Sequence, residues 1–498
     1  MNNLRPVAVL ALSFGVVTLA CLTLTPNAAS LTPEIQPPPT KQPQPLSAQP
    51  TPPPAVPPSE PTLFFAPTVA TQELSPSGPW VVFTNDAGIW AVNEDGTGLT
   101  LVSPDLPVFR TIVPAPSGGR LAYVIGSPPP YGHVTLHVFS LPERKEIASI
   151  PLTTETTEPE PGPERGPKNE AVEAAVGNTE QPNMAWSADG RNLAFVGVTE
   201  GDTADVYMYS ADTGEVTRLS SGPSQAYAPS WSPDGKYIVH LGAETFGTGA
   251  GYDMAGIWAA QSDGSKAIAL ENVNLGNGPG ILGWDGDEPA QFYLTAWGPD
   301  CGGYDLQKVD VETGKVKHLW EGVIRAAALN PSGRQLILAA AEGCGDTPAV
   351  VHVLPSEDTW IEPDVTPSEV KWLEETRSGH TAAALALTSQ GEFLYEHTGV
   401  RSPMVSPAAQ VGLPVQAPGA DTILWAGDGL WMGDLTNFKA SPVQIFQGVA
   451  TSVMASEGAE HLLIFTEGKL WVASASDGYL PVPVAEVQGG QGAVRVVQ

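Results

Sequence analysis

One short unit recurs along most of this chain, and its clearest copy spans residues 228–270. Its opening apolar strand leads into the turn Ser-Pro-Asp-Gly at 232–235, where proline presets φ and glycine accepts a positive φ. An alternating strand at 236–241, a third strand at 256–260 and a fourth at 266–270 complete the unit. Four short antiparallel strands with turns between them are typical of one propeller blade.

The turn and the third strand both recur, and this recurrence is the strongest evidence for the fold. The turn returns at residues 75–78, 115–118, 187–190, 284–286 and 330–333, and in looser form at 377–379, 417–419 and 456–458. The third strand returns at residues 88–90, 137–139, 206–209, 304–306, 351–353, 393–395, 429–431 and 469–471. These copies define nine units at spacings of roughly 40 to 50 residues, as in propeller repeats.

These motifs resemble the TolB-type propeller repeat, whose mark is a W-S-P-D-G turn, an I-W or I-Y strand and a D-G turn. The resemblance implies a propeller and leaves the function open. We therefore predict an all-β fold, a single β-propeller of four-stranded blades over residues 68–490. Eight blades are expected if the seventh unit, which begins at Ser368 without a proper turn signature, merges with its neighbours. Nine blades, or two smaller arrays, are the alternatives.

The N-terminal residues predict export. Residues 1–25 contain one arginine followed by an uncharged apolar run. This pattern indicates a signal peptide or a membrane anchor. This segment has three alternative fates: cleavage, retention as a single membrane span, or lipidation at Cys21. Lipidation is considered because residues 17–21 look like a bacterial lipobox. Residues 26–67 are rich in proline and predict a disordered, semi-rigid stalk, or a tail without a spacing role. Each alternative places the propeller outside the cytoplasm.

One internal segment interrupts the repeat. Residues 153–181 are rich in Glu, Pro and Thr and show no periodicity. Such an acidic, low-complexity insertion is expected to form a disordered surface loop, or an acidic loop that binds a partner.

The charge balance limits the partners. The formal net charge is -31, from 23 Lys and Arg against 54 Asp and Glu, and it would repel nucleic acid and anionic lipid heads. We expect no nucleic-acid partner, contact with a membrane only through the N-terminal segment, and a monomer.

Two cysteines lie in equivalent loops. Cys301 and Cys344 fall between the second and third strands of adjacent units, and such loops lie side by side on one face of a propeller. A disulfide between them would suit an oxidising compartment, and two unpaired thiols are the alternative.

The same loops supply the candidate ligand-binding residues. Loops on a rigid scaffold concentrate binding residues, and aromatic rings among Gly and Asp can stack on a sugar or seat a peptide. The candidates on this face are Tyr131, His133, Tyr252, Trp297 and Tyr304. Packing at blade edges is the alternative role for each of them.

Motifs for catalysis are missing from the sequence. It contains no G-x-S-x-G elbow and no H-E-x-x-H, and its Asp-Gly pairs lack the spacing of a calcium loop. Asp285 and Asp287 are a mild metal candidate, but we expect neither a metal site nor a cofactor. Some families join a propeller to a peptidase domain, and we expect none here because nothing after Val487 could hold one.

Three functions follow as hypotheses. The first is a non-enzymatic extracytoplasmic propeller, free or tethered, that binds an envelope or extracellular protein or a glycan through loops on one face. The second is an extracellular hydrolase or lyase whose site lies in the central channel, where distant blades could bring two carboxylates together. The third is a purely structural envelope component.

Overall fold

The computed structural model describes most of the repeat region. It covers residues 73–107, 111–126, 134–153, 167–176, 183–222, 224–245, 253–276, 278–298, 302–341, 350–354, 358–361, 367–374, 382–388, 390–396, 400–407, 413–486 and 491–498. The predicted leader with Cys21 and the predicted stalk lie outside these residues. Among the helices that are described, none is long and apolar enough to cross a lipid bilayer.

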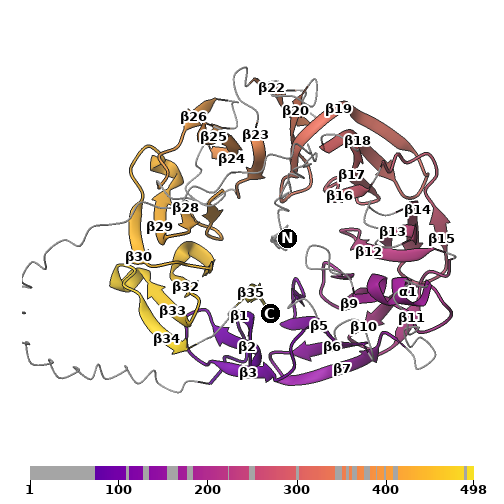
Figure 1. Ribbon diagram of the computed structural model, residues 1–498, viewed down its shortest axis with the longest axis horizontal. Helices are drawn as coiled ribbons and strands as arrows, with labels where there is room; N and C mark the ends of the chain where they lie inside the picture. Colours follow the sequence, from indigo (N-terminus) through magenta and orange to yellow (C-terminus); the bar gives the residue numbers. More distant parts are fainter. Residues whose placement is uncertain are drawn as a thin grey trace, which may run out of the picture. The chain divides into compact units, whose positions relative to one another are not determined.

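Eight antiparallel sheets follow one another around a ring (Figure 1). Three of the four-stranded sheets come from the first part of the repeat, apart from the last strand of the chain, β35, which joins the first of them: β35 (Gln491–Val496), β1 (Trp80–Asn85), β2 (Gly88–Asn93) and β3 (Thr100–Ser103); β4 (Ile112–Pro114), β5 (Arg120–Gly126), β6 (Val134–Ser140) and β7 (Lys145–Pro151); β8 (Met184–Trp186), β9 (Asn192–Gly197), β10 (Asp205–Ser210) and β11 (Val216–Arg218).

Four further four-stranded sheets complete the set of seven: β12 (Gln225–Trp231), β13 (Tyr237–Thr245), β14 (Asp253–Gln261) and β15 (Ala267–Ala269); β23 (Pro367–Trp372), β24 (Ala382–Thr388), β25 (Gly391–Glu396) and β26 (Arg401–Pro403); β27 (Val415–Gln416), β28 (Thr422–Ala426), β29 (Gly429–Asp434) and β30 (Val443–Gln447); β31 (Ser452–Ala455), β32 (His461–Phe465), β33 (Lys469–Ser474) and β34 (Val482–Glu486). Three 3-10 turns, Leu435–Asn437, Glu457–Ala459 and Ala475–Asp477, lie in the last two of these units.

The eighth sheet has seven strands because β19 serves two units. Its strands are β16 (Pro279–Trp284), β17 (Gln291–Gly298), β18 (Gly302–Asp310), β19 (Val316–Leu329), β20 (Leu336–Ala341), β21 (Val350–Leu354) and β22 (Asp358–Ile361). The first part of β19 pairs with β18 and its last part pairs with β20. All nine sequence units therefore appear within eight sheets, and the predicted all-β propeller is confirmed.

The repeated turn folds as its sequence predicts. In the turn between β12 and β13, the Ser232 hydroxyl donates to Asp234 at 2.8 Å, and the Lys236 amide donates to the same carboxylate at 3.1 Å. Gly235 has a φ of 72°, which residues with a Cβ rarely adopt. Ser187 and Asp189 make the same hydroxyl–carboxylate bond at 2.7 Å, so the motif sets one local structure in different units.

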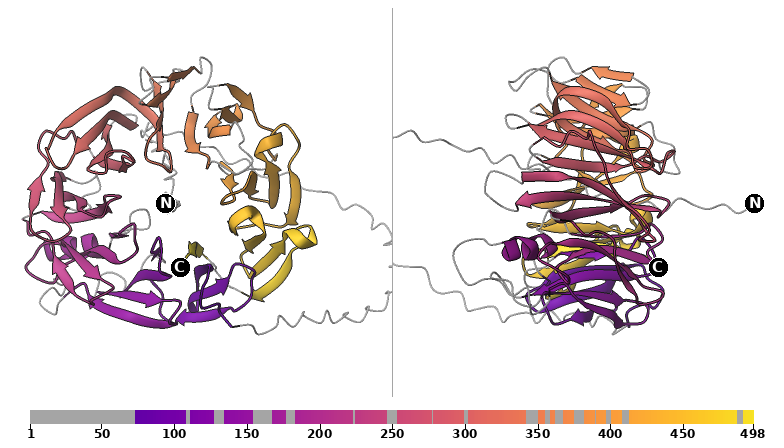
Figure 2. Two further views of the ribbon diagram at one scale, coloured as in Figure 1. Left: turned by 180° about the vertical axis from the view of Figure 1, so that it is seen from behind. Right: turned by 90° about the vertical axis from the view of Figure 1, so that its right-hand side faces the viewer.

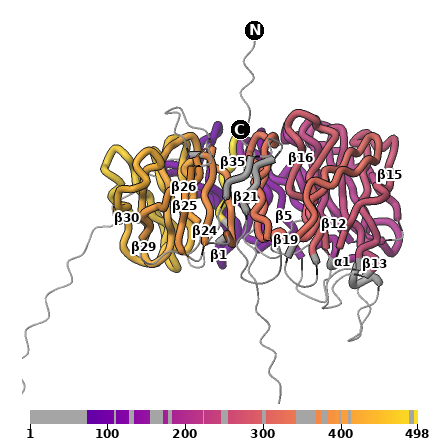
Figure 3. Tube along the Cα trace, turned by 90° about the horizontal axis from the view of Figure 1, so that it is seen from above, coloured from indigo at the N-terminus to yellow at the C-terminus, as the bar shows by residue number. Residues whose placement is uncertain are grey.

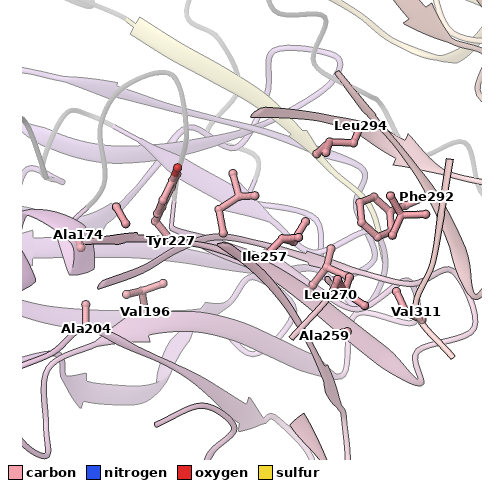
Figure 4. Close-up of a cluster of buried hydrophobic side chains, with 14 of the residues drawn as sticks. Ala174, Val196, Ala204, Tyr227, Ile257, Ala259, Leu270, Phe292, Leu294 and Val311 are labelled. Carbon is pink, nitrogen blue, oxygen red and sulfur yellow. The ribbon is translucent and has the colours of Figure 1, made fainter. Parts of the chain in front are cut away.

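Tryptophans at the ends of the inner strands join neighbouring sheets. The indole nitrogen of Trp231 donates to the carbonyl of Ala185 at 2.9 Å, and that of Trp284 donates to the Ser230 hydroxyl at 3.0 Å. Each bond reaches the inner strand of the preceding sheet. Figure 4 shows one of the apolar clusters between sheets, in which Tyr227, Ile257, Phe292 and Leu294 lie together. These tryptophans therefore pack between neighbouring sheets of the ring.

One helix corrects the predicted disordered insertion. Within residues 153–181, α1 (Pro167–Val176) forms and lies at one face of the ring (Figures 2 and 3). Its Ala171 and Ala174 are fully buried in the cluster between the sheets of β9 and β12. The Asn183 amide donates to the Ala174 carbonyl, and its oxygen accepts from the Ala228 amide at 2.9 Å. The acidic composition concealed a short alanine-rich run, and alanine has the highest helix propensity.

Candidate functional site

Two of the five predicted binding residues lie together in one unit. Trp297 is the second-last residue of β17 and is half-buried, and Tyr304 lies in β18 with 36% of its surface exposed. Both adjoin the connection from β15 to β16, because Gly276 of that connection forms a β-bridge with Trp297. Tyr131, His133, Tyr252 and the predicted disulfide partners Cys301 and Cys344 lie outside the described residues.

A set of hydrogen bonds fixes this connection to β18. The Tyr304 hydroxyl donates to the Asn274 side-chain oxygen at 3.0 Å, and the Asn274 amide group donates to Asp305 at 3.0 Å. The Gln307 side chain accepts from the main-chain amide of Asn274 at 2.8 Å and donates to its carbonyl at 2.7 Å. We call Asn274, Tyr304, Asp305, Gln307 and His318 the Asn274 network. Its members are held in place by one another, so it is a preorganised polar cluster, buried at Asp305 and Gln307 and exposed at Tyr304.

His318 is the most exposed ionisable member of this network. Its Nδ1 lies 3.1 Å from both carboxylate oxygens of Asp305. The Asp305 side chain is 4% exposed, whereas the His318 side chain is 45% exposed. In the tautomer whose Nδ1 carries the hydrogen, the imidazole donates to a buried acceptor and leaves Nε2 free to take a proton. A histidine oriented in this way by a carboxylate can act as a general base.

An earlier unit has a different pair of side chains at the positions of Asp305 and His318. Asp205 begins β10 and contacts Arg218 of β11 at 2.6 Å, at the positions that Asp305 and His318 occupy in β18 and β19. An arginine keeps its proton, so the Asp205–Arg218 pair can only be structural. In the later unit, a histidine therefore stands where the earlier unit has an arginine.

The two carboxylates named as a mild metal candidate have other partners. Asp285 accepts from the Tyr293 hydroxyl and from Lys308, both at 2.7 Å, and these donors keep the Asp285 pKa below its usual range although burial opposes them. Asp287 accepts from Arg334 at 2.9 Å. Both carboxylates therefore serve contacts within and between units. In the described part of the chain, no group of three or more metal-binding side chains converges.

Motif searches could not find the Asp305–His318 pair. The two residues belong to different strands, and their proximity depends on the register of β18 with β19. An alignment of the repeats could have indicated Asp305. In both units an acidic residue, Asp205 or Asp305, directly precedes the apolar residue of the third strand. Among the histidines, the prediction selected His133 because of its loop position and missed His318.

The sequence matches no known family profile. One similar curated protein is an uncharacterized peptidase, YuxL, of Bacillus subtilis, with 41% identity over 63 residues, covering 13% of this chain and 10% of that protein. Another is dipeptidyl-peptidase 5 of Porphyromonas gingivalis, with 23% identity over 149 residues, covering 28% of this chain and 21% of that protein. The chain thus spans less than a quarter of the length of either relative.

Similar solved structures include TolB of Acinetobacter baumannii, with 15% identity and a TM-score of 0.29, covering 56% of this chain and 61% of that chain. A similarity at this level concerns the fold alone. The ring of repeated sheets itself agrees with the resemblance to the TolB-type repeat.

The relatives correct one expectation. Both are named as peptidases, which contradicts the prediction that the chain is not an enzyme. That prediction depended on the absence of contiguous catalytic motifs from the sequence. Contiguous motifs do not report side chains that are brought together from separate strands, such as Asp305 and His318.

Proposed function

We propose that this chain acts in the hydrolysis of peptides, and that its Asn274 network is where a peptide substrate is bound and a proton is removed. The observation that carries this proposal is the exposed imidazole of His318 on the buried carboxylate of Asp305. The names of the two relatives support the choice of a peptide as substrate.

The network suits an extended peptide. The exposed Tyr304 ring offers an apolar surface beside the polar groups of Asn274 and His318. His318 Nε2 would accept a proton from the water whose oxygen attacks the peptide carbonyl, and would return it to the amine nitrogen as the C–N bond breaks. The Asp305 carboxylate would stabilise the imidazolium that forms between these two steps. This proposed site lies on the third and fourth strands of its unit rather than in a central channel.

The first prediction tests His318 directly. Purified full-length chain is incubated with a pool of synthetic peptides, and cleavage is followed by mass spectrometry. His318→Asn is expected to lower kcat for the cleaved peptides by about 10²- to 10⁴-fold, because it removes the proton acceptor but keeps a hydrogen-bonding side chain.

His137 provides the matched control. Its Nδ1 also meets a carboxylate, that of Glu146 at 2.7 Å, but the Glu146 side chain is 45% exposed. His137→Asn should leave cleavage unchanged. If wild-type protein cleaves no peptide in the pool, the proposed function is wrong. If His318→Asn cleaves as well as wild type, hydrolysis takes place elsewhere.

We also propose that the protein works outside the cytoplasm, which the composition of residues 1–25 supports. Mass spectrometry of the N-terminus of protein isolated from cells tests this directly. A native chain that keeps an unmodified Met1 and fractionates with cytosolic proteins would contradict it.

A further inference from the structure

One core position of the third strand is aliphatic in the described units, with a single exception. The aliphatic residues at this position are at most 1% exposed and are Ile89, Leu136, Val206, Ile257, Leu306, Leu430 and Leu470. In the seventh unit the position holds Glu392, which is 2% exposed. Burial of a carboxyl at such a position is unfavourable and calls for a specific role.

Glu392 lies in the contact between the seventh and eighth units. Its Oε2 accepts a hydrogen bond of 2.8 Å from the indole nitrogen of Trp425 in β28. Its Oε1 is buried and makes no hydrogen bond within the part of the chain that the structure describes. The surrounding cluster is apolar, with Leu385 and Leu394 on one side and Ile423 on the other. The carboxyl is therefore only half satisfied in an environment of low polarity.

Two more ionisable side chains share this face of the sheet. Glu369 and Glu392 both pair with Leu387, so the two carboxyls flank one position of β24. Lys371 follows Glu369 by two residues and therefore points to the same side. Burial raises the pKa of Glu392 and of Glu369 and lowers the pKa of Lys371.

Among the described residues, the other elements around Glu392 place no charged group against its carboxyl. Burial raises the pKa of Glu392, and the neutral donors Trp425 of β28 and Ser406, after β26, favour the ionised carboxyl less strongly than burial opposes it. Arg401 of β26 lies 3.5 Å from the centre of the Phe393 ring. Phe393 is adjacent to Glu392 along β25, so its side chain is on the opposite face.

We propose that Glu392 makes the contact between β25 and β28 a pH-dependent seam in the ring, closed while this carboxyl holds its proton and loosened when it ionises. The neutral acid can be buried with one hydrogen bond from Trp425, whereas the carboxylate would be a buried charge beside the acidic Glu369. The other units have an aliphatic residue here and are not expected to respond. This inference does not depend on the proposed hydrolysis.

Hydrogen exchange measured by mass spectrometry on the full chain tests the seam. Amides of 391–396 and 422–426 should lose about tenfold or more of their protection between about pH 5 and about pH 9, after correction for intrinsic exchange rates. Amides of β9 and β10 should keep their protection over the same pH range. In Glu392→Gln the loss should be absent, whereas Glu369→Gln and Lys371→Gln should retain it. Equal protection at both pH values in wild type, or an unchanged loss in Glu392→Gln, would overturn the proposal.

A second variant keeps the test decisive if the glutamine variant folds poorly. Glu392→Leu restores the side chain that other units carry, so its thermal midpoint at about pH 9 should lie above that of wild type. The difference should shrink at about pH 5. A midpoint equal to or below that of wild type at the higher pH would refute the seam.

Discussion

Deletion of residues 491–498 is expected to unfold the ring as a whole rather than to shorten one sheet. These residues form β35, the inner strand of a sheet whose other strands begin at Trp80. Val496 pairs with Trp80 and Val494 pairs with Val82. The pairing of β35 with β1 therefore closes the ring, as the position of β35 beside β1 shows in Figure 1.

The expected loss follows from what β35 buries. Val496 is fully buried in a cluster with Trp80 and Leu121, so β35 contributes to the core shared with the next sheet. Burial of one valine is worth about 1.5 to 3 kcal/mol, and exposing its neighbours adds to this. Total stability is about 5 to 15 kcal/mol, so removal of β35 should take away a large part of it.

A single substitution makes the same test without shortening the chain. Val496→Asp places a charge in this cluster, whereas Gln498→Asp adds the same charge at an exposed position. Thermal unfolding followed by near-ultraviolet circular dichroism should show a large decrease in midpoint for the deletion and for Val496→Asp. Gln498→Asp should match wild type. An unchanged midpoint after the deletion would show that β35 does not close the ring.

The sequence predicted those features that each unit repeats. Turns such as 232–235 and tryptophans such as Trp231 recur at fixed positions, so local chemistry and packing between units agree. The seventh unit was the weakest prediction, and in the structure it carries Glu392 in its core. Departures from the repeat therefore mark positions where something other than packing has determined the residue.

The residues that sequence reasoning missed depend on contacts between separate strands. Asp305 meets His318 only because of the register of β18 with β19, including an irregularity between Leu306 and Gln307. Helix α1 was missed for a related reason. Its alanines are buried only because β9 and β12 provide an apolar surface, which the composition of residues 153–181 does not reveal.

His240 is expected to make the folded protein lose stability in mild acid. It lies in β13 with 4% of its surface exposed, stacked on Trp258 with ring centres 5.7 Å apart. Its Nε2 is buried without a hydrogen bond in the part of the chain that the structure covers. Burial lowers the pKa of His240 to about 4, from an ordinary value of 6.5.

The sign of the effect follows from the two pKa values. Above about pH 6.5 the imidazole is neutral in both the folded and the unfolded chain, and stability is unaffected. As the pH falls from about 6.5 to about 4, the unfolded chain takes up a proton that the folded chain excludes. The free energy of unfolding should decrease by roughly 3 kcal/mol over this range. Glu369 and Glu392, whose pKa values are raised, act in the opposite direction.

Because several groups titrate together, the difference between variants is the quantity to measure. Wild type and His240→Phe are unfolded by denaturant at about pH 7 and about pH 5. The free energy of unfolding should fall less between these pH values in the variant, by about 2 kcal/mol. His461→Gln is the matched control, because His461 is only half-buried and its Nδ1 lies 3.0 Å from the Ser474 hydroxyl. His461→Gln should show the same fall in the free energy of unfolding between the two pH values as wild type. If His240→Phe keeps it too, the buried imidazole is not the group that makes the ring acid-sensitive.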